Sequence, residues 1–139
     1  MRKIIVVSLI LIIAVLSSSC VNNTSTVPDL WENATYTEDT LIGVGKNNLI
    51  LTVKAGDKSI DITVRTDMNN VGEVLKKHNV ISGEEGPYGI YVKVVNGIEA
   101  DYDKDQSYWS FEKDGEAMLT GVDSTEFKDG EHFELVRTK

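Results

Sequence analysis

Apolar and polar side chains alternate on both sides of a short turn in the first half of the chain. The apolar positions of the two runs are Leu49, Leu51, Val53, Ile60, Ile62 and Val64. Between them, Ala55-Gly56-Asp57-Lys58 has the composition of a tight turn. Because successive side chains of a strand point to opposite faces, the pattern predicts an antiparallel β-hairpin with one buried face. The fold must supply a partner that covers this face.

A short helix is predicted directly after the hairpin. Asn70, followed by Glu73 three residues later, fits the capping pattern of a helix N-terminus. The next apolar residues fall at i, i+3 and i+4, along one side of a helix, and are Val71, Val74 and Leu75. Basic residues suit the dipole at the expected C-terminus and are Lys76, Lys77 and His78. The sequence therefore predicts one helix packed across the hairpin.

The rest of the chain is strand-like. Strands are expected over residues 90–95, 98–100, 108–112, 116–119 and 132–137. Asn96-Gly97 and Asp114-Gly115 are strong hairpin turns, whereas residues 82–87, with two glycines and a proline, are expected to be irregular. A hairpin, a helix and then several strands predict an α+β fold, with one helix packed on a mixed sheet in a β-grasp-like (ubiquitin-like) arrangement.

The N-terminus has the three parts of a secretory signal. Met1-Arg2-Lys3 is basic, residues 4–16 form an apolar run of 13, and Ser17-Ser18-Ser19 leads to Cys20. The apolar run is shorter than the roughly 20 residues that a membrane-spanning helix needs. Small residues before the chain's single cysteine resemble a bacterial lipobox, although Ser17 stands where a lipobox prefers leucine.

This resemblance implies a signal peptide over residues 1–19 and a lipid on Cys20, which would hold the chain at the extracytoplasmic face of a bacterial membrane. An uncleaved N-terminal anchor and simple secretion with a free thiol remain alternatives. Residues 20–48 are interpreted as the lipidated N-terminus and a tether, on which Trp31 and Tyr36 either dock on the domain edge or cover a ligand. The domain itself is expected over residues 49–139.

Net charge argues against nucleic acid as a partner. The formal charge is −8, and it becomes −10 when the two cations Arg2 and Lys3 leave with the signal peptide. An anionic protein repels a phosphate backbone and anionic lipid.

An ordered series of short motifs resembles one known family. The motifs are Thr66-Asp67, Val71-Gly72-Glu73-Val74-Leu75, Tyr91-Val92, Val94-Val95-Asn96-Gly97-Ile98, Ala100-Asp101 with Asp105, Tyr108-Trp109-Ser110-Phe111, Gly121-Val122 and Asp129-Gly130-Glu131. Over residues 49–139 the chain is similar to the transcobalamin-like C-terminal domain, the small β domain of cobalamin carriers, with related copies in bacterial surface lipoproteins. The resemblance implies a β-grasp fold that binds a soluble ligand, with cobalamin or a related corrinoid as the candidate.

The large helical domain of the vitamin carriers has no counterpart in this sequence. Good small-molecule sites bury roughly 70–90% of the ligand surface, and one small domain covers only one face of a corrinoid. A second copy or another protein is therefore expected to complete the site.

The candidate ligand-binding residues are aromatic or lie in turns, and are Tyr88, Asn96, Gly97, Tyr108 and Trp109. Period-two alternation places Trp109 and Phe111 on the face expected to pack in the core, and Tyr108 on the other face.

Asp101, Asp103 and Asp105 have the spacing of the first three ligands of a calcium loop, and Glu112 has that of the last. Gln106 stands where the loop needs glycine, and strands flank the segment instead of helices. A solvated acidic loop is the alternative interpretation.

No catalytic motif is present in the sequence, and we expect the protein not to be an enzyme. His78 and His132, the two histidines, lie in no recognisable motif. The leading prediction is a lipid-anchored extracytoplasmic module that binds a small ligand. The alternative is a cell-surface module for protein interaction or adhesion, with or without calcium.

Overall fold

The predicted hairpin lies at the centre of the computed structural model, which describes residues 27–139. Strand β2 (Asn47–Ala55) pairs antiparallel with β3 (Lys58–Thr66). All six alternating apolar side chains are buried, so the hairpin prediction is confirmed. The predicted signal peptide and Cys20 lie outside the described residues.

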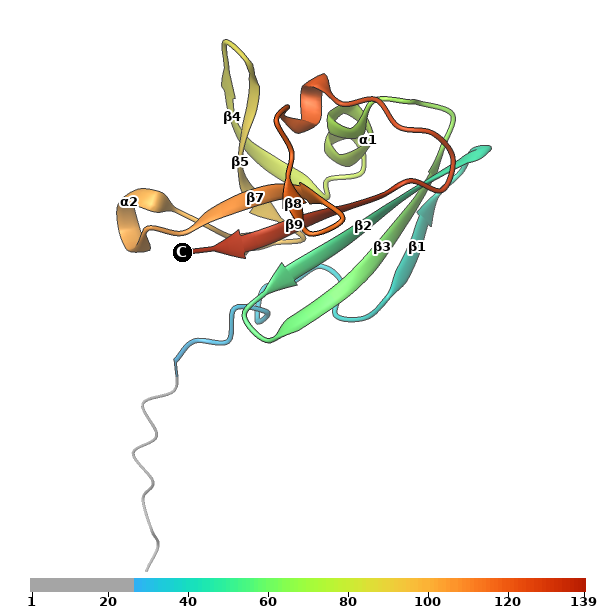
Figure 1. Ribbon diagram of the computed structural model, residues 1–139. Helices are drawn as coiled ribbons and strands as arrows, with labels where there is room; N and C mark the ends of the chain where they lie inside the picture. Colours follow the sequence, from blue (N-terminus) through green and yellow to red (C-terminus); the bar gives the residue numbers. More distant parts are fainter. Residues whose placement is uncertain (1–26) are drawn as a thin grey trace, which may run out of the picture.

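A six-stranded mixed sheet is built around this hairpin, in the order β1-β3-β2-β9-β7-β8 (Figure 1). Its other members are β1 (Thr40–Gly43), β7 (Tyr108–Lys113), β8 (Glu116–Ala117) and β9 (His132–Thr138). Strand β1 runs parallel to β3 and β9 runs parallel to β2, whereas the other pairs are antiparallel. The last strand of the chain therefore lies in the middle of the sheet, beside the first strand of the hairpin.

A second, antiparallel sheet has the order β4-β5-β6. Its strands are β4 (Ile81–Gly86), β5 (Gly89–Val95) and β6 (Ile98–Glu99). The prediction that residues 82–87 are irregular is wrong, because β4 pairs with β5 as far as Gly86 and a bulge after Ser82 absorbs the mismatch. Most of β4 is exposed, so no core selects an alternating pattern there.

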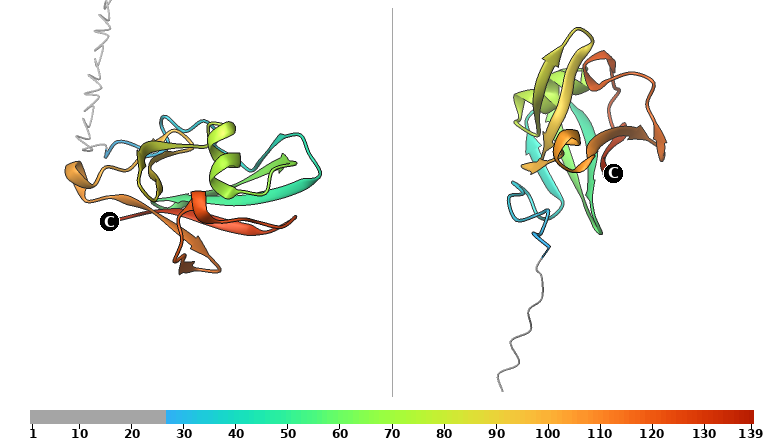
Figure 2. Two further views of the ribbon diagram at one scale, coloured as in Figure 1. Left: turned by 90° about the horizontal axis from the view of Figure 1, so that it is seen from above. Right: turned by 90° about the vertical axis from the view of Figure 1, so that its left-hand side faces the viewer.

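The predicted helix is α1 (Val71–Lys77), which lies on one face of the large sheet (Figure 2, left). The Glu73 N–H donates a 3.0 Å hydrogen bond to the Asn70 side chain, as the capping pattern predicts. Two further turns of helix are short, α2 (Tyr102–Asp105) and η1 (Val122–Ser124). No helix within residues 27–139 is long and apolar enough to cross a bilayer. The domain is mostly β, with one packed helix, which agrees with the predicted α+β class.

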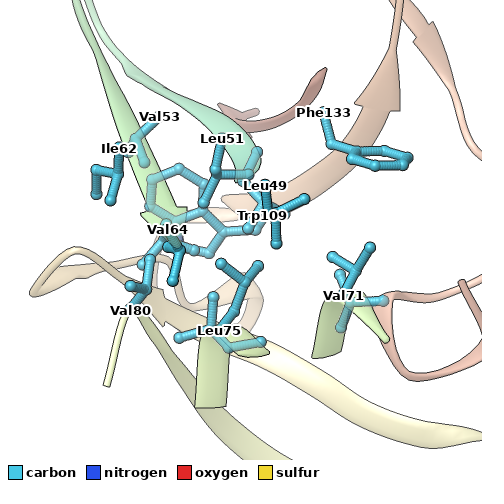
Figure 3. Packing of buried hydrophobic residues seen from close by; sticks show 14 of the residues in the cluster. Leu49, Leu51, Val53, Ile62, Val64, Val71, Leu75, Val80, Trp109 and Phe133 are labelled. Carbon is cyan, nitrogen blue, oxygen red and sulfur yellow. The ribbon is translucent and has the colours of Figure 1, made fainter. Parts of the chain in front are cut away.

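One cluster of buried side chains fills the space between the sheets and α1 (Figure 3). It extends along the chain from Trp31 to Leu135 and includes the predicted core residue Trp109. Phe133 of β9 and Leu75 of α1 are fully buried in it. Residues 27–139 therefore contain a hydrophobic core of their own, and this segment is suited to study as a separate chain.

Residues 28–36, called here the N-terminal segment, pack on the domain instead of extending from it. The Trp31 indole N–H donates to the Ala55 carbonyl at 2.9 Å, which agrees with the docking predicted for Trp31. The Tyr36 backbone is held by the Asn96 side chain. Further on, Thr40–Gly43 forms β1. The described part of the predicted tether is therefore folded, because its apolar residues and backbone groups find partners on the sheets.

Candidate functional site

An apolar groove of about 140 Å³ opens between the two sheets on the β7 side of the molecule. Its lining residues come from β5 and the loop that carries η1, which form the walls, and from β7 and β9, which form the floor. Figure 1 shows how these strands are arranged. The side chains that give the groove its apolar character are Ile90, Val92, Trp109, Phe111 and Val122. Such a surface favours the apolar face of a ligand over a charged group.

The floor of the groove is held by aromatic contacts. The rings of Phe111 and Phe133 stack with centroids 5.4 Å apart, and the Lys113 ammonium lies 5.0 Å from the Phe133 centroid. Trp109 is only 8% exposed, and its indole N–H donates to the Lys93 carbonyl at 3.2 Å. This bond joins β7 to β5, so the floor and one wall of the groove are fixed to each other.

Exposed aromatic and apolar side chains surround the groove. Tyr88, at the tip of the β4–β5 hairpin, is 93% exposed, and Tyr91 is 49% exposed. They line a neighbouring hollow of about 280 Å³, which shares Ile90 and Tyr91 with the groove. In the loop before η1, Leu119 is fully exposed two residues before the lining residue Gly121, and the N–H of its neighbour Met118 donates to the Phe111 carbonyl at 2.8 Å. Apolar groups gathered at a surface in this way mark a binding region.

Asp123 joins β5 and the η1 loop, which line the groove, to the helix α1. One carboxylate oxygen accepts the Ile90 N–H of the hairpin at 2.8 Å, and the other lies 2.9 Å from the Lys76 ammonium of α1. The Asp123 carbonyl accepts from the Asn70 side chain at 2.9 Å. The approach to α1 requires Gly72, because a Cβ there would lie 2.1 Å from the Asp123 carboxylate. One side chain therefore sets the distance between hairpin, helix and loop.

The charge state of Asp123 follows from these contacts. Burial of the carboxyl group opposes its ionisation, but the Lys76 ammonium and the Ile90 N–H outweigh burial and hold the pKa of Asp123 below its ordinary value of 3.8. The carboxylate is therefore ionised at neutral pH and keeps both partners.

The structure separates the predicted ligand-binding residues. Trp109 lies in the floor of the groove and Tyr88 lies at the adjoining hairpin tip. Tyr108 is partly exposed, as predicted, and precedes Trp109 by one residue, so it belongs to the other face of β7. Two of the five candidates thus lie at or beside the groove.

Asn96 and Gly97 instead hold the N-terminal segment. Asn96 is fully buried, and its side chain accepts the Tyr36 N–H at 2.9 Å and donates to the Tyr36 carbonyl at 2.8 Å. A Cβ on Gly97 would lie 2.3 Å from the Asn33 carbonyl oxygen. In this structure both residues face their own chain, because the predicted tether folds over the turn.

The carboxylates of Asp101 and Asp105, in the acidic segment after β6, make hydrogen bonds within the domain. Asp101 caps α2 by accepting the Asp103 N–H at 3.0 Å, and Asp105 accepts from Arg137 at 2.9 Å. The Ser107 hydroxyl and then the Arg137 guanidinium hold the pKa of Asp105 far below its ordinary range. Within residues 27–139 no group of three His, Cys, Asp or Glu side chains is placed to hold a metal ion, and the Asp101–Asp103–Asp105 series is not such a group.

A larger cavity, of about 490 Å³, lies between the N-terminal segment and β6. Its lining includes three carboxylates, those of Asp29, Glu32 and Glu99. This polar lining is poorly suited to an apolar ligand, and we regard the groove as the candidate site.

Sequence reasoning did not select Tyr91, Leu119 or Asp123. For Tyr91, strand alternation was a usable signal, because Ile90 and Val92 point to one face and leave the ring on the other. Leu119 and Asp123 lie in an irregular stretch without periodicity, where only the folded chain reveals which elements they meet.

Fold and groove together define a small α+β domain that presents an apolar, aromatic-rimmed hollow beside a projecting hairpin. A family model described as "Domain of unknown function (DUF4430)" matches residues 69–135. No curated protein matches the chain.

A solved structure supplies a relative. The crystal structure of a "putative metal binding protein" from Ruminococcus gnavus has 35% sequence identity and a TM-score of 0.63, and the match covers 68% of this chain and 98% of that one. The chain belongs to the family of this Ruminococcus gnavus protein. A second match is the crystal structure of haptocorrin in complex with Cbi, at 22% identity and a TM-score of 0.49, over 67% of this chain and 25% of haptocorrin. The more specific resemblance to transcobalamin C-terminal domains stays a prediction.

Proposed function

We propose that this protein is a lipid-anchored extracytoplasmic module that binds a small soluble ligand in the groove between β5 and the η1 loop. The observation that carries the proposal is the groove itself: a fixed aromatic floor of Trp109 and Phe111 next to the exposed rings of Tyr88 and Tyr91. Tyr88 and Tyr91 line one hollow together, and apolar groups gathered at a surface are typical of a binding site.

A corrinoid such as cobalamin is the ligand class that the sequence resemblance favours. The two adjoining hollows, of about 140 and 280 Å³, are each smaller than the roughly 300–1,000 Å³ typical of small-molecule sites. The domain would therefore cover one face of a large planar ligand. A second protein or a second copy of the chain would cover the other face.

The relative is described as metal binding, and a corrinoid is consistent with that description because it contains a metal. The protein would not have to coordinate the metal itself. The described residues bring no three metal-binding side chains together. In a corrinoid the ring itself coordinates the cobalt, so the protein would need only to bind the organic surface.

The strand arrangement supports a β-grasp fold as the finer description. A hairpin, a crossing helix and a final strand inserted parallel to β2 have the order that the sequence resemblance implies. The lipobox-like segment before Cys20 supports export and anchoring.

Ligand binding is tested by titrating residues 27–139 into cobalamin and recording the corrin absorbance spectrum. We expect a saturable spectral change that Tyr88→Ala and Tyr91→Ala weaken about tenfold, the equivalent of roughly 1.4 kcal/mol. Tyr102→Ala is the matched control, because Tyr102 is an exposed tyrosine on α2, outside the groove lining. No spectral change at high protein concentration would remove the corrinoid proposal.

Anchoring has a separate test in the full chain. Mass spectrometry of the protein isolated from bacterial membranes should find a diacylglyceryl group on Cys20, and Cys20→Ala should release the domain from the membrane fraction. A full-length chain with an intact Met1 and a free thiol contradicts the lipidation proposal.

A further inference from the structure

The sheet edges formed by the described residues differ in how they discourage pairing with another chain. Strand β4 carries a bulge and two acids, Glu84 and Glu85. Strands β6 and β8 are two residues long, and each carries one glutamate. Charges, bulges and short length are the usual devices that protect an edge from pairing.

Strand β1 carries neither a charge nor a bulge, and its four residues make it longer than β6 and β8. It spans Thr40-Leu41-Ile42-Gly43, and the next residue is Val44, so the stretch carries no charge. Leu41 is 63% exposed and Val44 is 91% exposed, whereas Ile42 packs against the core. Its inner side pairs with β3, and its outer side is the free edge of the six-stranded sheet.

We propose that β1 is a self-association edge, where a second copy of this chain pairs antiparallel to extend the sheet. The chain carries a formal charge of −8, so two copies repel each other over most of their surface. At β1 the two copies can meet without like charges facing each other. This inference is independent of the ligand proposed for the groove.

The acids before β1 select the antiparallel arrangement. Glu38 and Asp39 directly precede the strand, and Val44-Gly45 follows it without a charge. A parallel pair would place the acids of both copies side by side. A two-fold antiparallel pair instead places the acids of each copy near the uncharged end of the other, and it uses the same patch on both copies.

The size of the contact sets its strength. Four paired residues bury far less than the roughly 1,200 Å² of a stable interface. We therefore expect a weak dimer that forms at high local concentration, such as tethering to a membrane would produce. The groove lies on the β7 side of the sheet, so pairing at β1 leaves it open.

Sedimentation of residues 27–139 tests the proposal, and this segment lacks Cys20, so a disulfide cannot mimic the dimer. We expect the wild type to show concentration-dependent dimerisation below about 1 mM, and Leu41→Lys and Val44→Lys to weaken it at least tenfold. The matched control Leu119→Lys places the same charge at an exposed leucine outside β1, in the loop before η1, and should leave dimerisation unchanged.

Hydrogen exchange distinguishes edge pairing from other modes of association. Backbone amides of residues 40–43 should become protected as the wild-type concentration rises, and the amides of β4 should not. A wild type that stays monomeric up to 1 mM overturns the proposal, as does a dimer that persists in both lysine variants, which thermal melting must show to be folded.

Discussion

The two long hairpins of this protein have the same topology and opposite environments. In β2–β3, each alternate apolar side chain is buried under α1 and the second sheet. In β4–β5, most side chains from Ser82 to Gly89 are exposed, and the hairpin projects from the body of the domain (Figure 1). The first hairpin supplies stability, and the second offers a surface that other molecules can contact.

The projecting hairpin is held at several points along β5, from Ile90 near the tip to Lys93 further down the strand. They include the Ile90 N–H bond to Asp123, the Trp109 bond to the Lys93 carbonyl and the packing of Ile90 and Val92 on the core. Such sparse anchoring is typical of segments that open locally more easily than the core. Substitutions in β2–β3 and the core should therefore mainly lower stability, whereas substitutions at the exposed tip of β4–β5 should mainly affect binding.

The largest effect on stability is expected from Phe133→Ala in the core strand β9. Phe133 is almost fully buried and stacks on Phe111, so its truncation leaves a cavity and removes the aromatic pair. We expect a loss of about 3–5 kcal/mol in the free energy of unfolding, measured by urea denaturation. A loss below about 1 kcal/mol would contradict the packing assigned to the centre of the sheet.

Asn96→Ala should have the next largest effect. The substitution removes both side-chain bonds to the Tyr36 backbone and places alanine at a positive φ of 52°. We expect a loss of about 2 kcal/mol in the free energy of unfolding. Asn96→Gly keeps the backbone conformation accessible, so its smaller loss should isolate the contribution of the hydrogen bonds. Equal stability of wild type and both variants would mean that the N-terminal segment is not held at this turn.

Asp123→Asn should loosen the hairpin in a pH-dependent way. The lowered pKa of the Asp123 carboxyl group means that ionisation stabilises the fold above the ordinary value of 3.8, and that this contribution is lost as pH falls through the lowered folded value. At pH 7 we expect the variant to be about 1 kcal/mol less stable. The difference from wild type should shrink in acid, as measured by denaturation across pH.

Lys76→Met is the companion variant, because it removes the cation that favours the Asp123 carboxylate. It should reduce the same pH dependence. A wild type and an Asp123→Asn variant that differ equally at pH 7 and at pH 2 would show that the contact is not electrostatic.

Tyr88→Ala should have the smallest effect on stability. The ring is 93% exposed, so the free energy of unfolding should change by less than about 0.5 kcal/mol. If the groove binds a ligand, the same substitution should weaken that binding. A large loss of stability would place the ring in the fold and not at a binding surface.

The sequence predicted the parts of the fold that a core selects. Alternation around Leu51 and Ile62 identified the central hairpin, and the capping residue Asn70 located α1, because burial and capping leave local patterns. Strand β4 was missed because its side chains face water and its pairing depends on β5. The packing of the N-terminal segment over Asn96 was not predicted, because Tyr36 lies 60 residues before Asn96 in the sequence.

The candidate site was predicted only in part for the same reason. Trp109 and Tyr88 stand out as aromatic residues in a strand and a turn. Asp123 acquires its role only when the hairpin, α1 and the η1 loop meet around it. No local sequence pattern predicts that these three elements come into contact at Asp123.

The most direct test of the central claim is an NMR titration of isotope-labelled residues 27–139 with cobalamin. The account predicts saturable shifts of the amides from Tyr88 to Val92, the Trp109 indole and the amides from Leu119 to Val122, while β1 to β3 stay unchanged. Absence of any shift at saturating cobalamin, or shifts confined to the N-terminal segment and β6, would contradict it.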